Sequence, residues 1–93
     1  MYQLALGQSA RKALKRYKKS GSFPRRTFDE IAMLLMRGEP LPARCKDHAL
    51  RGEFSESREC HIAFDLLLIY ERNEALGIVT ISRIGTHPEL FGG

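Results

Sequence analysis

Two stretches in the first half of the chain carry apolar residues at the spacing of an amphipathic helix. The first follows Ser9, a candidate N-cap, and its apolar positions at i, i+3, i+4 and i+7 are Ala10, Ala13, Leu14 and Tyr17. The second begins near Pro24, ends at Gly38 and Pro40, and has the apolar stripe Phe28, Ile31, Ala32 and Leu35. Because only a few residues around Ser20-Gly21-Ser22 separate the two stretches, we expect an antiparallel helical hairpin.

The second half of the chain changes to the pattern of β-strands. Residues 58–63, 66–71 and 76–83 are β-like, the run LLLIY at 66–70 predicts a well-buried strand, and residues 2–6 predict a short first strand. Connections this short favour antiparallel neighbours. We therefore expect a single α+β domain over residues 1–93, with the helical hairpin packed on one side of a small, curved antiparallel sheet.

The end of the chain contains the start of a further helix. Thr86 is followed three residues later by Glu89, which is the spacing of a capping box. A short helical turn is therefore expected to begin at His87. This would leave His87 exposed, near Arg83 and close to a sheet edge.

Charge is distributed unevenly along the chain. The net charge of +4 conceals eleven Lys and Arg against three acids in residues 1–46, and four against eight in residues 47–93. A basic half favours a polyanion or an acidic protein as partner, although a basic helix face can equally be an ordinary solvated surface. No apolar run is long enough to cross a membrane and no apolar leader follows Met1, so we expect a cytoplasmic protein.

Five ionisable side chains suggest acid–base chemistry; they are His48, His61, Asp65, Arg83 and His87. If the chain stays extended, His61 and Asp65 project from one face of a strand. Histidine and carboxylate groups can transfer protons near neutral pH, and Arg can bind a crowded phosphate through forked hydrogen bonds. Metal-free cleavage of RNA needs these three functions together.

A zinc site is the competing interpretation of the same region. Cys45-x-x-His48 and Cys60-His61 would supply enough ligands in number. Adjacent strand residues point to opposite faces, however, so Cys60 and His61 could hardly bind one ion together. We therefore expect no metal and no cofactor, and two cysteines that are reduced and partly buried.

Three sequence blocks resemble a known family. They are GEPLPARCKDHALRGEF at 38–54, RECHIAFDLLLIY at 58–70 and RIGTHPELF at 83–91. In this order they are similar to the signature blocks of the YafQ branch of RelE-type toxins, which are bacterial ribonucleases of type II toxin–antitoxin systems. The resemblance implies a RelE-like fold, in agreement with the α+β arrangement expected above.

The resemblance also implies catalytic roles. His87 would protonate the leaving oxygen and Asp65 would accept the proton of the 2′-hydroxyl, with support from His48 and His61. No metal would take part, and the products would carry a 2′,3′-cyclic phosphate and a 5′-hydroxyl.

Substrate binding is implied for further residues. Arg83 would contact the phosphate, Phe91 would pack or stack on a base, and Lys46 would add a cation to the substrate site. The basic side of the first helix would dock on ribosomal RNA through Arg11, Lys12, Lys15, Arg16 and Lys19.

The implied setting is cleavage of messenger RNA on the ribosome, blocked by a cognate antitoxin. The toxin alone would be a monomer, and with the antitoxin it would form a larger complex. Phe64-Asp65-Leu66 stands where the family usually has Pro-Asp-Trp, so an aromatic residue is missing and the codon preference stays open. The alternative is a non-catalytic basic module that binds RNA, the ribosome or an antitoxin.

Overall fold

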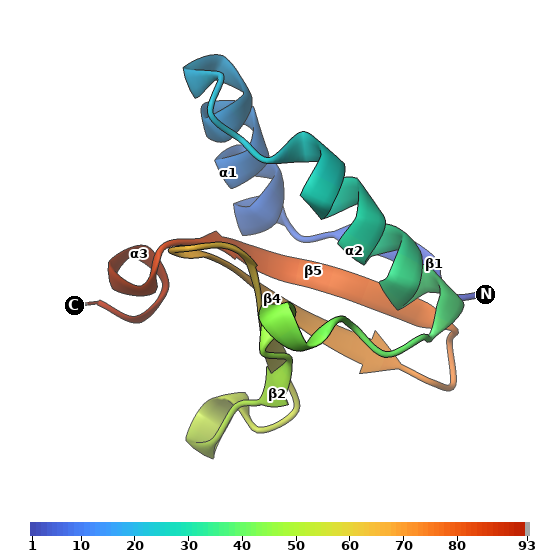
Figure 1. Ribbon diagram of the computed structural model, residues 1–93. Helices are drawn as coiled ribbons and strands as arrows, with labels where there is room; N and C mark the ends of the chain where they lie inside the picture. The colour runs from blue at the N-terminus through green and yellow to red at the C-terminus, as the bar shows by residue number, and fades with distance from the viewer. Residues whose placement is uncertain (93) are drawn as a thin grey trace.

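The computed structural model describes residues 1–92. Within them, five strands form one sheet, and two long helices lie on one of its faces (Figure 1). This is the α+β arrangement expected from the sequence. The elements follow in the order β1 (Gln3–Leu6), α1 (Gln8–Ser20), α2 (Arg25–Arg37), η1 (Ala43–Cys45), β2 (His48–Ala49), η2 (Gly52–Phe54), β3 (Arg58–Ala63), β4 (Leu66–Asn73), β5 (Ile78–Gly85) and α3 (His87–Phe91).

The sheet is mixed, so the prediction of a purely antiparallel sheet is wrong at one edge. The strand order is β1-β5-β4-β3-β2, and all neighbours are antiparallel except β1 and β5, which run parallel. A parallel pair needs a long crossover connection, and everything from α1 to β4 lies between these two strands. The rule of short connections applies only to strands that follow one another directly.

Both faces of the sheet bury apolar residues, and β4 contributes to both. The side chains of 66–70 are all buried. Because successive strand residues point to opposite faces, the even-numbered ones pack under the helices and the odd-numbered ones face away from them. On that far side, which we call the open face, Leu67 and Ile69 form a small cluster with Leu50 and Leu90.

The two long helices diverge from their connection as a V over the sheet, instead of running closely side by side (Figure 1). The ring of Phe23 packs against those of Tyr17 and Phe28 where the helices meet. From there α1 passes over β5, and α2 lies against β1 and β3. No helix in residues 1–92 is long and apolar enough to cross a membrane.

The first helix begins earlier than predicted. Its N-cap is Gly7, not Ser9, and no side chain caps it. Gly7 donates its N–H to the carbonyl of Ile81 at the end of β1, and its own carbonyl accepts from the N–H of Arg11. The strand thus passes directly into the helix, which leaves Ser9 inside the first turn.

The predicted helical turn at the end of the chain is confirmed. The hydroxyl of Thr86 accepts the N–H of Glu89 at 3.3 Å, and the carboxylate of Glu89 accepts the N–H of Thr86 at 2.8 Å. Gly85 lies directly beneath this turn, where a Cβ atom would stand 3.1 Å from a Glu89 oxygen and 3.2 Å from the Leu90 side chain. The absence of a side chain at position 85 therefore lets α3 fold back against β5.

Candidate active site

Four of the predicted site residues converge at one end of the sheet. His61 lies on β3, Asp65 lies in the β3–β4 turn, and His87 and Phe91 lie on α3. The ring centroid of His87 is 6.0 Å from that of His61 and 6.0 Å from that of Phe91. We call these four residues the His87 cluster.

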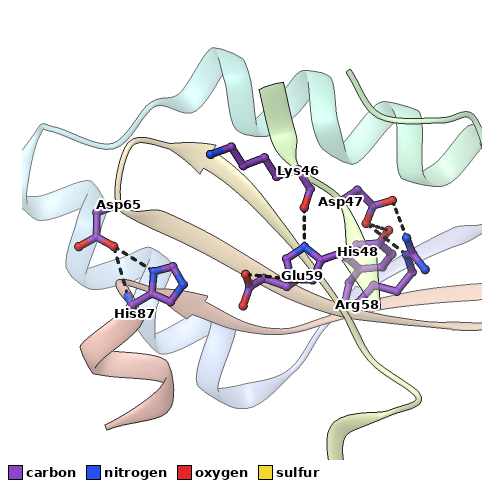
Figure 2. Close-up of polar contacts among 8 residues, drawn as sticks. Lys46, Asp47, His48, Arg58, Glu59, Asp65 and His87 are labelled. Carbon is purple, nitrogen blue, oxygen red and sulfur yellow. Dashed lines mark hydrogen bonds and ion pairs between the residues drawn. The ribbon is translucent and has the colours of Figure 1, made fainter. Parts of the chain in front are cut away.

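Asp65 contacts His87 through one oxygen. Its Oδ1 accepts a hydrogen bond from the backbone N–H of His87 at 3.4 Å and lies 3.5 Å from Nδ1 of the ring (Figure 2). The Asp65 side chain is 46% exposed and that of His87 is 53% exposed, so a ligand can reach both. As far as residues 1–92 are concerned, neither Asp65 Oδ2 nor His87 Nε2 has a hydrogen-bond partner.

His61 reaches the cluster by a different route from the one predicted. The strand β3 ends at Ala63, after a shift in its register with β4, and Asp65 lies in the turn that follows. Shared strand parity with Asp65 is therefore the wrong reason for their convergence, because the chain does not stay extended to residue 65. Burial lowers the pKa of His61, against a smaller opposing effect of Glu59, which favours the neutral ring at neutral pH.

A second group of contacts joins β2 to β3 around His48. Its Nδ1 lies 2.6 Å from the carbonyl oxygen of Lys46, and its Nε2 lies 3.5 Å from Oε1 of Glu59 (Figure 2). A carbonyl oxygen only accepts, so Nδ1 carries the hydrogen. Glu59 is 4% exposed, and a buried carboxylate is normally compensated by a partner of this kind. Sequence reasoning missed Glu59, although its position two residues before His61 on β3 gives it the same face.

Asp47 fastens the loop that carries Lys46 and His48 to the sheet. Its carboxylate accepts hydrogen bonds from the hydroxyl of Tyr70 at 2.7 Å and from Arg58 at 3.2 and 3.3 Å. Burial, together with the hydrogen bond to Asp47, raises the pKa of Tyr70, so its hydroxyl stays protonated and donates. Lys46 has a φ of 49°, which is uncommon for a residue with a side chain. Asp47 was also missed, and the positions of Lys46 and His48 depend on it.

Arg83 lies on the open face beside these groups. In the register of the sheet, Glu59 pairs with Ile69 and Ile69 pairs with Arg83, so the three form a row across β3, β4 and β5. Arg83 is half-buried, and its guanidinium makes no hydrogen bond or ion pair to any residue that the structure describes. Its charge is available to an anion on this face.

Glu89 connects α3 to α1. In addition to the Thr86 N–H, its Oε1 accepts the hydroxyl of Tyr17 at 2.7 Å, and its Oε2 lies 3.4 Å from the guanidinium of Arg16. The hydrogen bond from the Thr86 backbone, followed by that from Tyr17, lowers the pKa of Glu89. One carboxylate thus joins the basic helix to the short helix that begins with His87.

The predicted docking cations lie on the solvent side of α1. Arg16 is engaged by Glu89, and the others are exposed at the surface; they are Arg11, Lys12, Lys15 and Lys19. They lie on the helix layer, whereas His48, Glu59 and Arg83 lie on the open face. The His87 cluster lies between these two surfaces, because Glu89 of α3 contacts Tyr17 and Arg16 of α1.

The cysteines belong to the core. Cys45 and Cys60 are free and buried, and burial raises the pKa of both thiols. Cys60 packs under the helices while His61 faces the other way, as strand parity requires. Among residues 1–92, no group of three or more His, Cys, Asp or Glu side chains is arranged to hold a metal ion.

Comparison with known proteins identifies the family. The sequence model of the family described as "Bacterial toxin of type II toxin-antitoxin system, YafQ" matches residues 2–92. The chain belongs to the YafQ family. The family inferred from the three sequence blocks is thereby confirmed.

Relatives of this YafQ-family chain agree in sequence and in fold. A segment of 62 residues is 39% identical to the mRNA interferase toxin YafQ of Escherichia coli K12 and spans 67% of this chain but only 65% of that protein. The crystal structure of a metal-bound toxin from Helicobacter pylori superposes with a TM-score of 0.90 at 32% identity, covering 98% of this chain and 100% of the other. A chain of the E. coli DinJ–YafQ complex superposes with a TM-score of 0.86 at 28% identity, covering 99% and 100%.

Proposed function

We propose that this protein is a ribosome-dependent endoribonuclease that cleaves messenger RNA by metal-independent acid–base catalysis. The observation that carries the proposal is the contact between Asp65 and His87, because each side chain keeps one atom free for proton transfer. A general acid and a general base must both lie within reach of the same phosphate. The name of the E. coli relative, an mRNA interferase, supports messenger RNA as the substrate.

Asp65 and His87 divide the two proton transfers. Asp65 accepts the proton of the 2′-hydroxyl through Oδ2, and the resulting oxygen attacks the adjacent phosphorus. The bond to the 5′ oxygen breaks, and His87 gives that oxygen a proton from Nε2. One fragment then carries a 2′,3′-cyclic phosphate and the other a free 5′-hydroxyl. Each positioned acid or base contributes about 10²–10⁴-fold to the rate.

The surrounding residues bind the substrate and stabilise the negative charge on its phosphate. Arg83 is free to bind the phosphate as negative charge develops on it, which is the usual role of Arg at such a site. Phe91 is 43% exposed beside the His87 ring and offers a surface on which a base can stack. His61 and His48 support the reaction from β3 and β2.

The partners follow from charge and from the relatives. Exposed Lys and Arg side chains on α1 supply sequence-independent affinity for ribosomal RNA. The E. coli relative has been crystallised in a complex with DinJ. We expect this chain likewise to be neutralised by a cognate antitoxin protein.

The test compares cleavage of a ribosome-bound message by the parent protein, His87→Ala and Asp65→Asn. We expect both variants to lose about 10²–10⁴-fold in rate while circular dichroism shows them folded. Asp29→Asn is the matched control, since this aspartate is exposed on α2 and pairs only with Arg25 within the described chain. A message with a 2′-deoxy nucleotide at the scissile position must resist cleavage, because it lacks the nucleophile.

Two results would contradict the proposal. If the folded His87→Ala protein cuts RNA at the parent rate, the acid must be sought at His61 or His48. If the parent protein binds the ribosome or an antitoxin but cuts no RNA, the protein is a binding module rather than an enzyme.

A further inference from the structure

Phe64 is an aromatic side chain with no place in the core. It lies in the β3–β4 turn, next to Asp65, and is 100% exposed. The other exposed phenylalanines, Phe54 and Phe91, are 38% and 43% exposed. A fully exposed phenyl ring gains nothing from burial in the folded protein, and its whole face is open to contact with another molecule.

Phe64 stands at the rim of a hollow beside the His87 cluster. The hollow has a volume of about 260 Å³, and Arg44, Lys46 and His61 line it together with Phe64. His61 lines the hollow and its ring centroid lies 6.0 Å from that of His87, so the hollow adjoins the candidate active site. In Figure 2 the side chain of Lys46 extends from its loop toward the β3–β4 turn.

The positive charges around this hollow favour an anionic ligand. Lys46 has an exposed ammonium group, and Arg44 has only a loose contact with Glu30, at 3.8 Å with both side chains more than half exposed. A contact of this kind is easily exchanged for another anion. An aromatic face next to two cations is the combination that binds single-stranded nucleic acid, with a base on the ring and phosphates on the cations.

We propose that this hollow binds the nucleotide that adjoins the scissile phosphate of the RNA, with its base stacked on Phe64 and its phosphate held by Lys46 and Arg44. The inference rests on the proposed ribonuclease function and assigns that function a second substrate contact. Base stacking on a phenyl ring tolerates every base. The hollow therefore adds affinity and holds the chain in place, while it leaves the choice of sequence to other contacts.

The experiment measures cleavage of a ribosome-bound message as a function of message concentration, for four variants. Phe64→Ala and Phe64→Leu remove the aromatic ring, whereas Phe64→Tyr keeps one. Phe54→Ala is the control, because it removes another exposed phenylalanine, in η2. We expect Phe64→Ala and Phe64→Leu to raise KM by about 5- to 100-fold, as for loss of one stacked base, with a smaller effect on kcat. Phe64→Tyr and Phe54→Ala should stay within twofold of the parent protein.

A binding measurement separates the inference from the function on which it rests. The same message with 2′-deoxy nucleotides at the cleaved codon cannot be cut, and its Kd should rise in parallel with KM for Phe64→Ala. Because Phe64 is fully exposed, the thermal midpoint of each variant should equal that of the parent.

The possible failures are distinct. An active parent protein whose KM and Kd are unchanged by Phe64→Ala overturns the inference and leaves the ribonuclease function standing. Unchanged KM together with weaker binding of the antitoxin would assign Phe64 to a protein interface and also overturn it. A parent protein that cuts no RNA would overturn the proposed function itself.

Discussion

Removal of the Glu89 carboxylate should displace His87 indirectly, by loosening the attachment of α3 to the rest of the protein. Glu89 is exposed at the surface and, within the described residues, makes no hydrogen bond to any member of the His87 cluster, yet it bonds to Thr86, Tyr17 and Arg16. A helix as short as α3 has no stability of its own in water. Its place on the protein therefore depends on Leu90, on the capping box and on this carboxylate.

The free-energy cost of removing the Glu89 carboxylate can be summed from its separate contacts. Loss of a capping interaction costs about 0.5–2 kcal/mol, and a hydrogen bond such as that from Tyr17 contributes about 0.5–1.5 kcal/mol. The ion pair with Arg16 adds close to nothing, because both side chains are largely exposed. Since the carboxylate is itself 43% exposed, we take the lower half of each range. We therefore expect Glu89→Ala to destabilise the docked α3 by about 1–2 kcal/mol, or roughly 5- to 30-fold in its equilibrium.

The assay is a double-mutant cycle with Tyr17→Phe, read by thermal unfolding and by RNA cleavage. We expect a coupling energy between the two changes of about 0.5–1.5 kcal/mol. Arg16→Ala is the control for the ion pair and should change little. The rate of cleavage should fall for Glu89→Ala, and Glu89→Gln should fall between Glu89→Ala and the parent, since it keeps one accepting oxygen.

Acidification gives an independent check. The folded-state pKa of Glu89 lies below its ordinary value of 4.5, so its stabilising contribution is complete above that value and is lost as the pH falls through the lowered pKa. The difference in stability between the parent and Glu89→Gln should shrink over the same range. Strictly additive effects of Tyr17→Phe and Glu89→Ala, with cleavage unchanged, would refute this reasoning.

Three further predictions concern the docking helix, metals and His61. Reversal of Lys12, Lys15 and Lys19 to Glu should weaken ribosome binding and flatten its dependence on salt, because fewer counterions are released; an unchanged slope would mean an ordinary solvated helix face. Protein stripped with EDTA should keep its rate when returned to the ribosome assay, and restoration of a lost rate by added zinc or copper would indicate a metal mechanism. The pKa of His61, followed by NMR, should lie below 6.5, so stability should fall as the pH drops below 6.5 in the parent and less in His61→Gln.

The sequence was sufficient for the elements that carry a strong local pattern. β3 has the bounds predicted for it, both long helices end at their glycines, and the capping box at Thr86 is present. These features depend on the spacing of a few neighbouring residues. The two-residue strand β2 and the parallel pairing of β1 had no such signal, because they depend on partners far away in the chain.

The candidate site was predictable in its residue types but not in its connections. The sequence suggested His61, Asp65 and His87 as parts of one acid–base site, and in the structure they lie in one cluster. The buried Glu59 and the link from Glu89 to Tyr17 were not foreseen, since they arise when separate elements pack together. Leu66, which stands where the resemblance has an aromatic residue, is a core side chain under the helices.

The parallel pairing of β1 with β5 has a consequence for synthesis of the protein. Gln3 pairs with Ile78 and Leu6 with Ile81, so the first strand made has no partner until β5 has been translated. Contacts this distant in sequence form late, because the entropy cost of closing a long loop comes before the contacts can stabilise the fold. The chain that leaves the ribosome thus carries its basic helix early, but it acquires the His87 cluster only when residues 78–91 have emerged and the sheet can close. Under the proposed function, the nascent chain would be attracted to ribosomal RNA before it has the groups that would cut a message.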